Sequence, residues 1–330
     1  MMKAIQFTKG DAGNMSLGET NKPVAKLGEV LIKVVASAVN RADTLQRKGS
    51  YNPGPGISPI LGLEVAGTIE EVADDNQSWK KGDRVMALVS GGGYAEYIAV
   101  KSSHVLSVPP NLGLVEAGGV PEVWCTAYQI LLTIGKLCEG ESVLIHAGTS
   151  GVGLAAIQLA KMTKAKNIII TCGSNEKCQM GLKMGATVAI NYKEADFKEK
   201  TLEITNGKGV DVILDCIGAS YCEKNAECLA LDARWVLYGL MGGANIQGDL
   251  LAKLMRKRAS LIGTLLRSRS DDYKDDLIDS VRKHVLPGIE SGKLKPIIDS
   301  IFDLKDVSDA HRRMEANSNI GKIVLKVINE

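Results

Sequence analysis

The feature that most constrains the fold is an apolar run that ends in a glycine-rich turn and continues into a helical pattern. Residues 142–147 read SVLIHA, the turn Gly148–Gly153 reads GTSGVG, and helical patterning continues to Thr163. In such a turn the first glycine permits a sharp bend and the last one permits close helix–strand packing. The backbone amides at the start of the helix can then bind a pyrophosphate. The order of strand, glycine turn and helix therefore predicts a dinucleotide-binding unit.

After this turn, strand-like and helix-like segments alternate along the chain. The expected strands are 142–147, 167–171, 188–191, 210–215, 235–238 and 260–263, and the expected helices are 151–163, 177–184, 223–231, 250–257 and 271–291. Alternation of this kind is typical of a parallel sheet with helices on both faces. The predicted fold class is therefore α/β, with a doubly wound parallel sheet of the Rossmann type.

The first third of the chain has a different texture, with short β-like runs separated by turn residues. These runs are 29–36, 65–71, 84–88 and 94–100. The loop 51–59 (YNPGPGISP) is too rich in proline and glycine for a helix or a central strand. The last forty residues return to short strands that end with 322–327. A length of 330 residues exceeds the usual size of one core, so two domains are expected.

The end of the second expected strand indicates which dinucleotide is bound. An NAD-specific site places Asp or Glu there to accept from the ribose 2′-hydroxyl, whereas this strand ends in Thr171, Cys172, Gly173 and Ser174. Lys177 follows one helical turn beyond Gly173. A hydroxyl and a cation suit a 2′-phosphate, so NADPH is the predicted cofactor.

Several segments together resemble the quinone oxidoreductases of the medium-chain dehydrogenase/reductase superfamily over essentially the whole chain. They are 37–43 (SAVNRAD), 61–67 (LGLEVAG), 143–153 (VLIHAGTSGVG), 214–218 (LDCIG), 234–243 (RWVLYGLMGG) and 315–324 (EANSNIGKIV). The resemblance implies a GroES-like, mainly β catalytic domain at residues 1–120 and 289–330, with a Rossmann domain inserted at 121–288. It also implies a homodimer joined through edge strands near residues 260–266.

The resemblance further implies site residues. NADPH contacts are expected from Ser150, Gly151, Val152, Gly173, Ser174, Lys177, Tyr192, Ile217, Gly239, Leu240, Met241, Leu265, Arg267, Asn319 and Lys322. Asn40, Tyr51 and Thr126 are the candidate catalytic residues, beside the nicotinamide or its acceptor. Asn40 would orient a carbonyl or the ribose, and Tyr51 would donate a hydrogen bond or simply anchor its loop. Asp43 would be a structural turn acid.

No metal site is expected. Zinc-dependent relatives place a Cys where this chain has Asn40. They place a His followed by a Glu where it has Leu63 and Glu64, so only the Glu of that pair is present. Reduction of an isolated ketone localises negative charge on oxygen and needs strong electrophilic help. A quinone spreads that charge over a ring and yields a phenol-like product that ionises near pH ~10. A small-molecule quinone is therefore the expected substrate, and an enoyl-thioester or alkenal reductase is the enzymatic alternative.

Composition leaves few other functions open. The net charge is +2 and aromatic residues make up 4% of the chain, so a nucleic-acid partner is not expected, despite the basic run 253–258. No apolar stretch is long enough to span a bilayer, and the N-terminus lacks a signal-peptide pattern. The seven cysteines include no CxxC pair, so they are interpreted as reduced thiols of a cytoplasmic protein. The non-enzymatic alternatives are a crystallin-like structural protein and an RNA-binding protein.

Overall fold

The computed structural model describes residues 1–73 and 78–328. The chain divides into two compact units, which are described separately. One consists of residues 126–266, and the other combines residues 1–125 with residues 267–330.

The unit of residues 126–266 contains a six-stranded sheet in which all neighbouring strands are parallel. Its strands are β8 (Ser142–Ile145), β9 (Asn167–Cys172), β10 (Val188–Asn191), β11 (Val210–Asp215), β12 (Leu229–Leu237) and β13 (Ser260–Gly263). The spatial order is β10-β9-β8-β11-β12-β13, so successive strands run outward from β8 on one side and from β11 on the other. This is the strand order of a dinucleotide-binding Rossmann sheet, and it confirms the predicted fold class.

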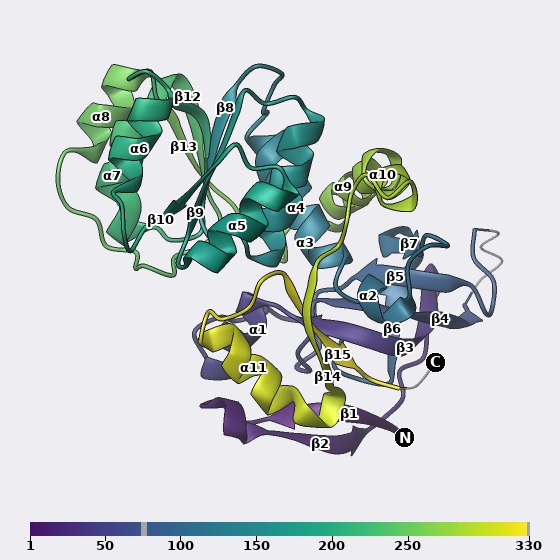
Figure 1. Cartoon of the computed structure of the whole chain (residues 1–330). Coiled ribbons are helices and arrows are strands. Elements are labelled where there is room, and N and C mark those ends of the chain that lie inside the picture. Colours follow the sequence, from purple (N-terminus) through teal and green to yellow (C-terminus); the bar gives the residue numbers. More distant parts are fainter. Residues whose placement is uncertain (74–77, 329–330) are drawn as a thin grey trace. The chain divides into compact units, whose positions relative to one another are not determined.

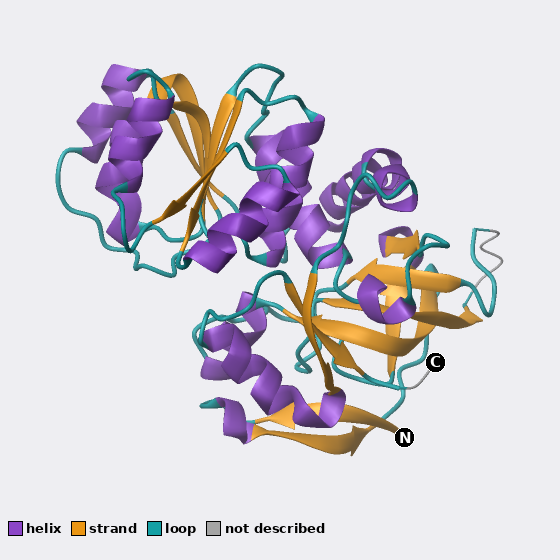
Figure 2. Cartoon of the chain, in the orientation of Figure 1, coloured by secondary structure: helices purple, strands orange, loops and turns teal. Residues whose placement is uncertain are grey.

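Helices cover both faces of this sheet (Figures 1 and 2). They are α4 (Gly151–Met162), α5 (Asn175–Met184), α6 (Phe197–Ile204), α7 (Cys222–Cys228) and α8 (Leu250–Lys257). Phe197, Ala226 and Leu250, from the last three helices, pack with Leu144, Ile213 and Trp235 of the sheet in one buried cluster. The helix expected over 223–231 ends at Cys228, because Leu229 already begins β12 and pairs with Val210.

The second unit is built on a mainly antiparallel sheet. Its strands, in spatial order, are β14 (Ile298–Asp303), β15 (Lys322–Lys326), β3 (Glu29–Val39), β4 (Glu64–Val72), β5 (Arg84–Leu88) and β7 (Val105–Ser107), and β6 (Tyr97–Lys101) also pairs with β3. Only β14 and β15 are parallel to each other. Because β15 pairs with β3, the C-terminal segment completes a sheet begun near the N-terminus. The hairpin of β1 (Met2–Phe7) and β2 (Met15–Thr20) forms a separate small sheet.

Among the described residues, six α-helices belong wholly or partly to this second unit. They are α1 (Arg41–Lys48), α2 (Leu114–Ala117), α3 (Pro121–Tyr128), α9 (Asp271–His284), α10 (Leu286–Glu290) and α11 (Val307–Glu315). The single helix expected over 271–291 is interrupted at Val285, and Pro287, which has no N–H to donate, lies in the first turn of α10.

The division by packing differs from the expected domain boundaries, most clearly near residue 288. Helix α9 had been placed in the inserted domain, but it packs against β7 and the turn that precedes it. Lys101 donates to Asp275 over 2.7 Å, and Arg282 donates to the Val105 carbonyl over 3.0 Å. By these contacts residues 267–288 group with the compact unit that contains both chain ends, and the domain boundary expected at residue 288 stays a prediction.

Two further findings concern the part of the chain that the structure describes. Within it, no helix is both long enough and apolar enough to cross a bilayer. All seven cysteines are free thiols, and only Cys138 is exposed.

Candidate functional site

The glycine-rich turn lies where the strand order of the parallel sheet reverses, between β8 and β11. A Cβ on Gly148 would lie 2.5 Å from Ile170 Cβ, so the turn approaches β9 too closely for any side chain. A Cβ on Gly153 would lie 2.5 Å from the Ala147 carbonyl oxygen. Both glycines are therefore required by packing, as the sequence predicts. The first amides of α4 lie where the strand order reverses, which is the place where α/β proteins of this kind bind ligands.

Ser150 and Ser174 begin the two helices that follow β8 and β9. The Ser150 hydroxyl oxygen accepts from the Gly153 N–H over 3.0 Å, and the Ser174 hydroxyl oxygen accepts from the Lys177 N–H over 3.3 Å. Each serine is thus an N-cap, and its own O–H proton remains able to donate. The hydroxyl of Ser150 was expected to contact a phosphate, and its capping role is compatible with that contact.

The candidate 2′-phosphate residues come together after β9. A Cβ on Gly173 would lie 2.7 Å from the Tyr192 hydroxyl oxygen, so this phenol lies against the Gly173 backbone. The nearby Glu194 carboxylate accepts from Asn175 and Asn191, over 3.0 and 2.8 Å. The end of β9 is therefore surrounded by Gly173, the hydroxyls of Ser174 and Tyr192, and Lys177 in the first turn of α5. None of the residues 172–174 is acidic.

Three connections after β11, β12 and β13 hold the remaining residues of this unit that were predicted to bind cofactor. The Met241 N–H donates to the Cys216 carbonyl over 3.1 Å, which fastens the 239–243 segment beside Ile217. A Cβ on Gly239 would lie 3.0 Å from that same carbonyl. Leu240, Met241 and Leu265 are each about half exposed, between 49% and 52%. Exposed apolar groups beside polar amides are typical of a site that binds an amphipathic ligand.

Thr126, a candidate catalytic residue, and His146, which was not a candidate, both have buried surroundings. Thr126 is buried on α3. His146, at the end of β8, is buried, with hydrogen bonds from its two ring nitrogens to Thr171 (2.9 Å) and Asn225 (2.7 Å). Burial lowers the pKa of this imidazole, which fits a neutral ring within a fixed network.

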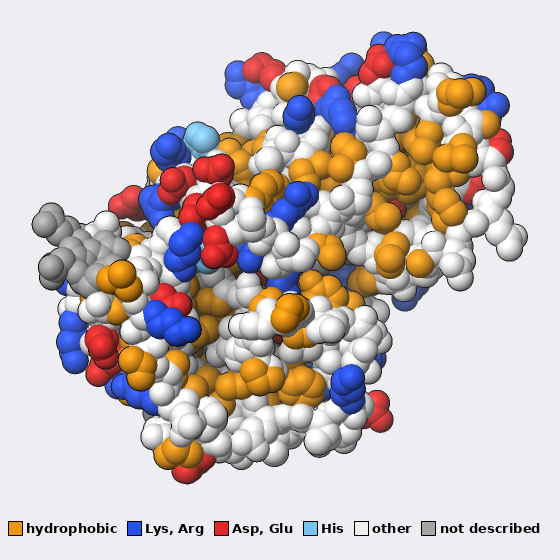
Figure 3. Space-filling view, turned by 180° about the vertical axis from the view of Figure 1, so that it is seen from behind, with side chains coloured by type: hydrophobic (Ala, Val, Ile, Leu, Met, Phe, Trp, Pro, Cys, Tyr) orange, Lys and Arg blue, Asp and Glu red, His pale blue; other side chains and the backbone are white. Residues whose placement is uncertain are grey.

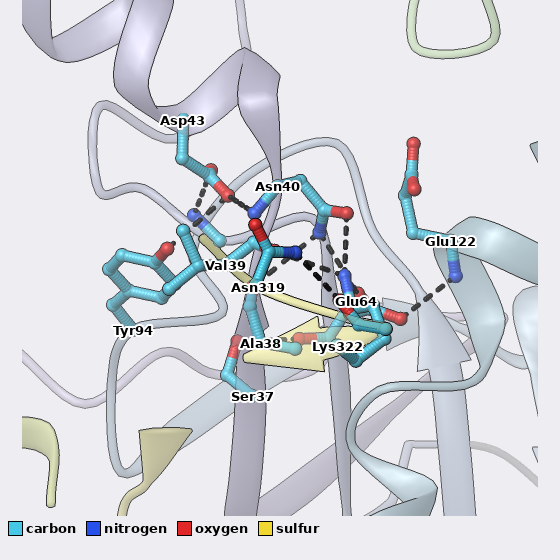
Figure 4. Close-up of polar contacts among 12 residues, drawn as sticks. Ser37, Ala38, Val39, Asn40, Asp43, Glu64, Tyr94, Glu122, Asn319 and Lys322 are labelled. Atoms are coloured by element: carbon cyan, nitrogen blue, oxygen red, sulfur yellow. Dashed lines mark hydrogen bonds and ion pairs between the residues drawn. The ribbon is translucent and has the colours of Figure 1, made fainter. Parts of the chain in front are cut away.

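The unit with both chain ends contains a second cluster, in which Asn40, Glu64 and Lys322 point toward one another (Figure 4). The Lys322 ammonium lies 2.6 Å from Glu64 Oε1, and donates to Asn40 Oδ1 over 2.7 Å and to the Val39 carbonyl over 3.1 Å. Asn40 Nδ2 donates to the same Glu64 oxygen over 2.9 Å. All three side chains are at least nine-tenths buried. Because an ammonium has three donors, those of Lys322 are all used inside this unit.

Lys322 was predicted only as a cofactor contact, and its pairing with Glu64 was missed. A lysine directly before the apolar run 323–325 was the available signal, since a buried lysine requires a partner. Asn319, another predicted cofactor residue, donates to the Gly321 carbonyl over 2.8 Å and so shapes the turn that leads into Lys322.

Asp43 has the structural role that the sequence predicts. Its carboxylate accepts from the Asn40 N–H over 2.8 Å and from the Gly62 N–H over 2.9 Å, so it fixes the start of α1 against the 60–63 segment. Burial raises the pKa of Asp43 to about 6, although the two backbone donors oppose that rise. Tyr94 joins this carboxylate to His311, and Arg47 lies on the other side of the His311 ring.

The donor set does not fit zinc. Leu63 is apolar and buried, and the oxygens of Asn40 and Glu64 are engaged by Lys322. Zinc sites in proteins are built mainly from thiolates and imidazoles. Within residues 1–73 and 78–328, no three side chains of His, Cys, Asp or Glu come together as a metal-binding group.

Tyr51 and Arg267, two further predicted site residues, are neighbours. The guanidinium carbon of Arg267 lies 5.4 Å from the centre of the Tyr51 ring. Burial raises the pKa of Tyr51, and the Arg267 charge opposes that rise. Tyr51 is thus a neutral phenol that can donate a hydrogen bond.

Comparison with known proteins places these features in context. A model described as the alcohol dehydrogenase GroES-like domain matches residues 26–110, and one described as zinc-binding dehydrogenase matches residues 151–283. Human quinone oxidoreductase is 33% identical over 306 residues, which cover 92% of this chain and 90% of that protein. The synaptic vesicle membrane protein VAT-1 homolog of Danio rerio is also 33% identical, but the chain spans only 65% of its length.

Two solved structures are similar over nearly the whole chain. The quinone oxidoreductase of Escherichia coli complexed with NADPH has a TM-score of 0.87 and 28% identity, covering 99% of this chain and 100% of that one. The JamJ enoyl reductase, in its apo form, has a TM-score of 0.87 and 26% identity, with 99% of each chain covered.

The Asn40–Glu64–Lys322 cluster yields a stability prediction. Lys322→Met leaves the Glu64 carboxylate buried without a cation, and we expect it to lower the free energy of unfolding by about 3–5 kcal/mol. The double variant Lys322→Met/Glu64→Gln removes both charges and should regain much of that loss. Urea unfolding followed by circular dichroism measures both. Lys326→Met on the same strand is the control, and a loss as small as the control's would contradict the analysis.

Proposed function

The chain belongs to the medium-chain dehydrogenase/reductase superfamily, and from this premise we propose that it is an NADPH-dependent oxidoreductase that reduces quinones. Bound NADPH supplies a hydride to the acceptor. The observation that carries the choice of acceptor is the engagement of Asn40 and Glu64 by the Lys322 ammonium, because it leaves neither residue to hold an electrophilic metal. An acceptor that disperses negative charge over a conjugated ring suits such a site.

The cofactor residues follow from the chemistry at the ends of the parallel strands. The first turn of α4, capped by Ser150, presents the amides of Gly151 and Val152 to the pyrophosphate. Ser174, Lys177 and Tyr192 would hold the 2′-phosphate through hydroxyl and ammonium donors. Ile217, Leu240, Met241 and Leu265 would provide apolar contacts along the dinucleotide. The similar quinone oxidoreductase of E. coli is complexed with NADPH, which supports the choice of this cofactor.

The chain's own contribution to the reaction is mainly positioning. Asn40 is pinned through both its amide oxygen and its amide nitrogen, so its side chain has one fixed orientation. Tyr51, kept neutral by burial, can donate a hydrogen bond to an acceptor oxygen. Such fixed groups accelerate a transfer by holding the reactants in place.

An enoyl-thioester reductase is the second candidate, since the JamJ enoyl reductase has the same TM-score as the quinone oxidoreductase of E. coli. We expect NADPH oxidation to be faster with 1,2- and 1,4-naphthoquinone than with trans-2-enoyl thioesters, measured as kcat/KM from the absorbance of NADPH. The opposite ranking would favour the enoyl reductase, and no turnover of any acceptor would favour a non-enzymatic role.

The assignment of the 2′-phosphate site gives a second prediction. Lys177→Ala should raise the KM for NADPH by about tenfold or more, because a charge-assisted contact is lost, and should leave the KM for NADH nearly unchanged. Lys183→Ala, an exposed lysine later in the same helix, is the matched control. Equal effects of Lys177→Ala on the two cofactors would refute the assignment.

We also propose that two copies associate through β13, the edge strand of the parallel sheet. Within the described residues β13 pairs only with β12. Leu231, Leu251, Met255 and Leu261 are exposed on or near this edge. Figure 3 shows apolar side chains gathered on this unit. An open strand with apolar neighbours is a surface that natural proteins usually cover.

Light scattering coupled to size-exclusion chromatography tests the dimer. The native protein should have twice the chain mass of 35.2 kDa. Leu261→Lys places a charge on the edge strand, so this variant should have the mass of a single chain. Leu182→Lys, on exposed helix α5, should not change the mass. A native protein that elutes with the mass of one chain would exclude the dimer.

A further inference from the structure

In the unit that contains both chain ends, two cations are buried without a carboxylate partner among the described residues. Arg267 is 8% exposed and Lys274 is 6% exposed. Arg267 Nε donates to the Ser90 carbonyl and Nη1 to Gln46 Oε1, each over 2.7 Å. Lys274 Nζ donates to the Ser90 hydroxyl over 3.1 Å. Within the described residues these partners are all neutral, and both side chains meet at Ser90.

One hydrogen-bonding group of this pair is unused. The Nη2 atom of Arg267 is buried and has no hydrogen-bond partner within the described residues. A Cβ on Gly91 would lie 3.3 Å from Nη2 and 2.9 Å from the Ser58 carbonyl oxygen. The absence of a side chain at position 91 therefore leaves room for the guanidinium beside the 57–58 segment.

Burial of two like charges without a counterion is unfavourable, because each loses hydration and each repels the other. Accordingly, burial lowers the pKa of Arg267 and that of Lys274. The carboxylates that act on the pair from a longer range are Asp43 and Asp271. Asp43 is already held by two backbone amides, and Asp271 lies in the exposed first turn of α9. Neither neutralises the pair by direct contact.

The residues around Arg267 indicate what kind of molecule could bring a negative charge to this pair of cations. The Tyr51 ring lies beside the Arg267 guanidinium, and Tyr51 is only half-buried. A planar ring can stack on a tyrosine, while an acidic substituent on that ring reaches an arginine fork. The site therefore suits a flat conjugated molecule with one negative charge.

We propose that Arg267, assisted by Lys274, binds an anionic substituent of the electron acceptor, so that the preferred acceptor is a conjugated ring bearing a carboxylate, a sulfonate or an ionised hydroxyl. The resemblance to known families had instead assigned Arg267 to the dinucleotide. This inference rests on the proposed function for the identity of the acceptor, but the anion site itself is a property of the apoprotein. A phosphate of the dinucleotide is also an anion that could pair with Arg267. The experiment therefore distinguishes an anionic acceptor from the dinucleotide.

The first arm measures binding without turnover. Isothermal titration calorimetry with 2-naphthoate, a flat anion, is carried out on the protein free of NADPH, with neutral 2-naphthol as the reference ligand. Arg267→Gln should weaken naphthoate binding at least tenfold and change naphthol binding little. Arg267→Lys should recover part of the loss. Arg269→Gln, two residues away with the same change of charge, is the control. An effect of Arg267→Gln no larger than the control's would overturn the proposal.

The second arm measures turnover with 1,4-naphthoquinone-2-sulfonate and 1,4-naphthoquinone. Each variant's kcat/KM ratio for the two quinones is divided by that of the native protein, so that intrinsic reactivity cancels. Arg267→Gln should lower this ratio at least tenfold. An unchanged ratio with a raised KM for NADPH would assign Arg267 to the dinucleotide and overturn the inference. If the native protein turns over neither quinone but still binds naphthoate, the proposed function is rejected and the anion site is retained.

Thermal unfolding of the apoprotein distinguishes a structural role from a binding role. A pair of buried, uncompensated cations costs stability, so Arg267→Gln should unfold at the same temperature as the native protein or a higher one. A melting temperature well below that of Arg269→Gln, together with undiminished discrimination for naphthoate, would make Arg267 a structural residue and overturn the proposal.

Discussion

The ion pair between Lys322 and Glu64 joins three strands that are far apart in sequence. Lys322 begins β15, Glu64 begins β4, and Asn40 follows β3, so one ammonium links the C-terminal segment to two strands of the first third. A buried carboxylate and a buried ammonium are each unfavourable alone, and only the register that brings them together satisfies both. The cluster also fixes the chemistry of the site, because the side-chain oxygens that remain from the metal-binding pattern of related proteins are committed to a cation of the chain itself.

The parallel sheet depends on a different constraint, which is the lack of space around Gly148 and Gly153. The turn contacts Ile170 on one side and the Ala147 carbonyl on the other, so the start of α4 is set directly over the end of β8. This places the first amides of α4 at the point where strand order reverses. The two units thus differ in chemistry: one has backbone amides and hydroxyls at the ends of its parallel strands, and the other contains a rigid polar cluster and a pair of buried cations.

Much of this arrangement could be predicted from the sequence, because the relevant signals are local. The glycine turn, the six strands of the parallel sheet and the absence of an acid after β9 are all read from neighbouring residues. The early end of α7 was not predicted, since it depends on the pairing of Leu229 with Val210. The break at Val285 was also not predicted, although Pro287 is a local signal for it. The membership of α9 in the second unit depends on contacts between Asp275 and Lys101, which are 174 residues apart. Pairings such as Lys322 with Glu64, or Arg267 with Gln46, are likewise not visible in a single sequence.

The sheet that contains both chain ends also has an order of synthesis. Strand β3 is made early, whereas β15, its neighbour in the finished sheet, is made only after every strand of the parallel-sheet unit. The whole parallel-sheet unit is complete before then and has every strand it needs. We therefore infer that the parallel-sheet unit can fold first during translation, while residues 36–39 of β3 still lack the partner that β15 will provide. Until β15 is made, the backbone N–H and C=O groups of that stretch are open to pairing with a strand of another chain.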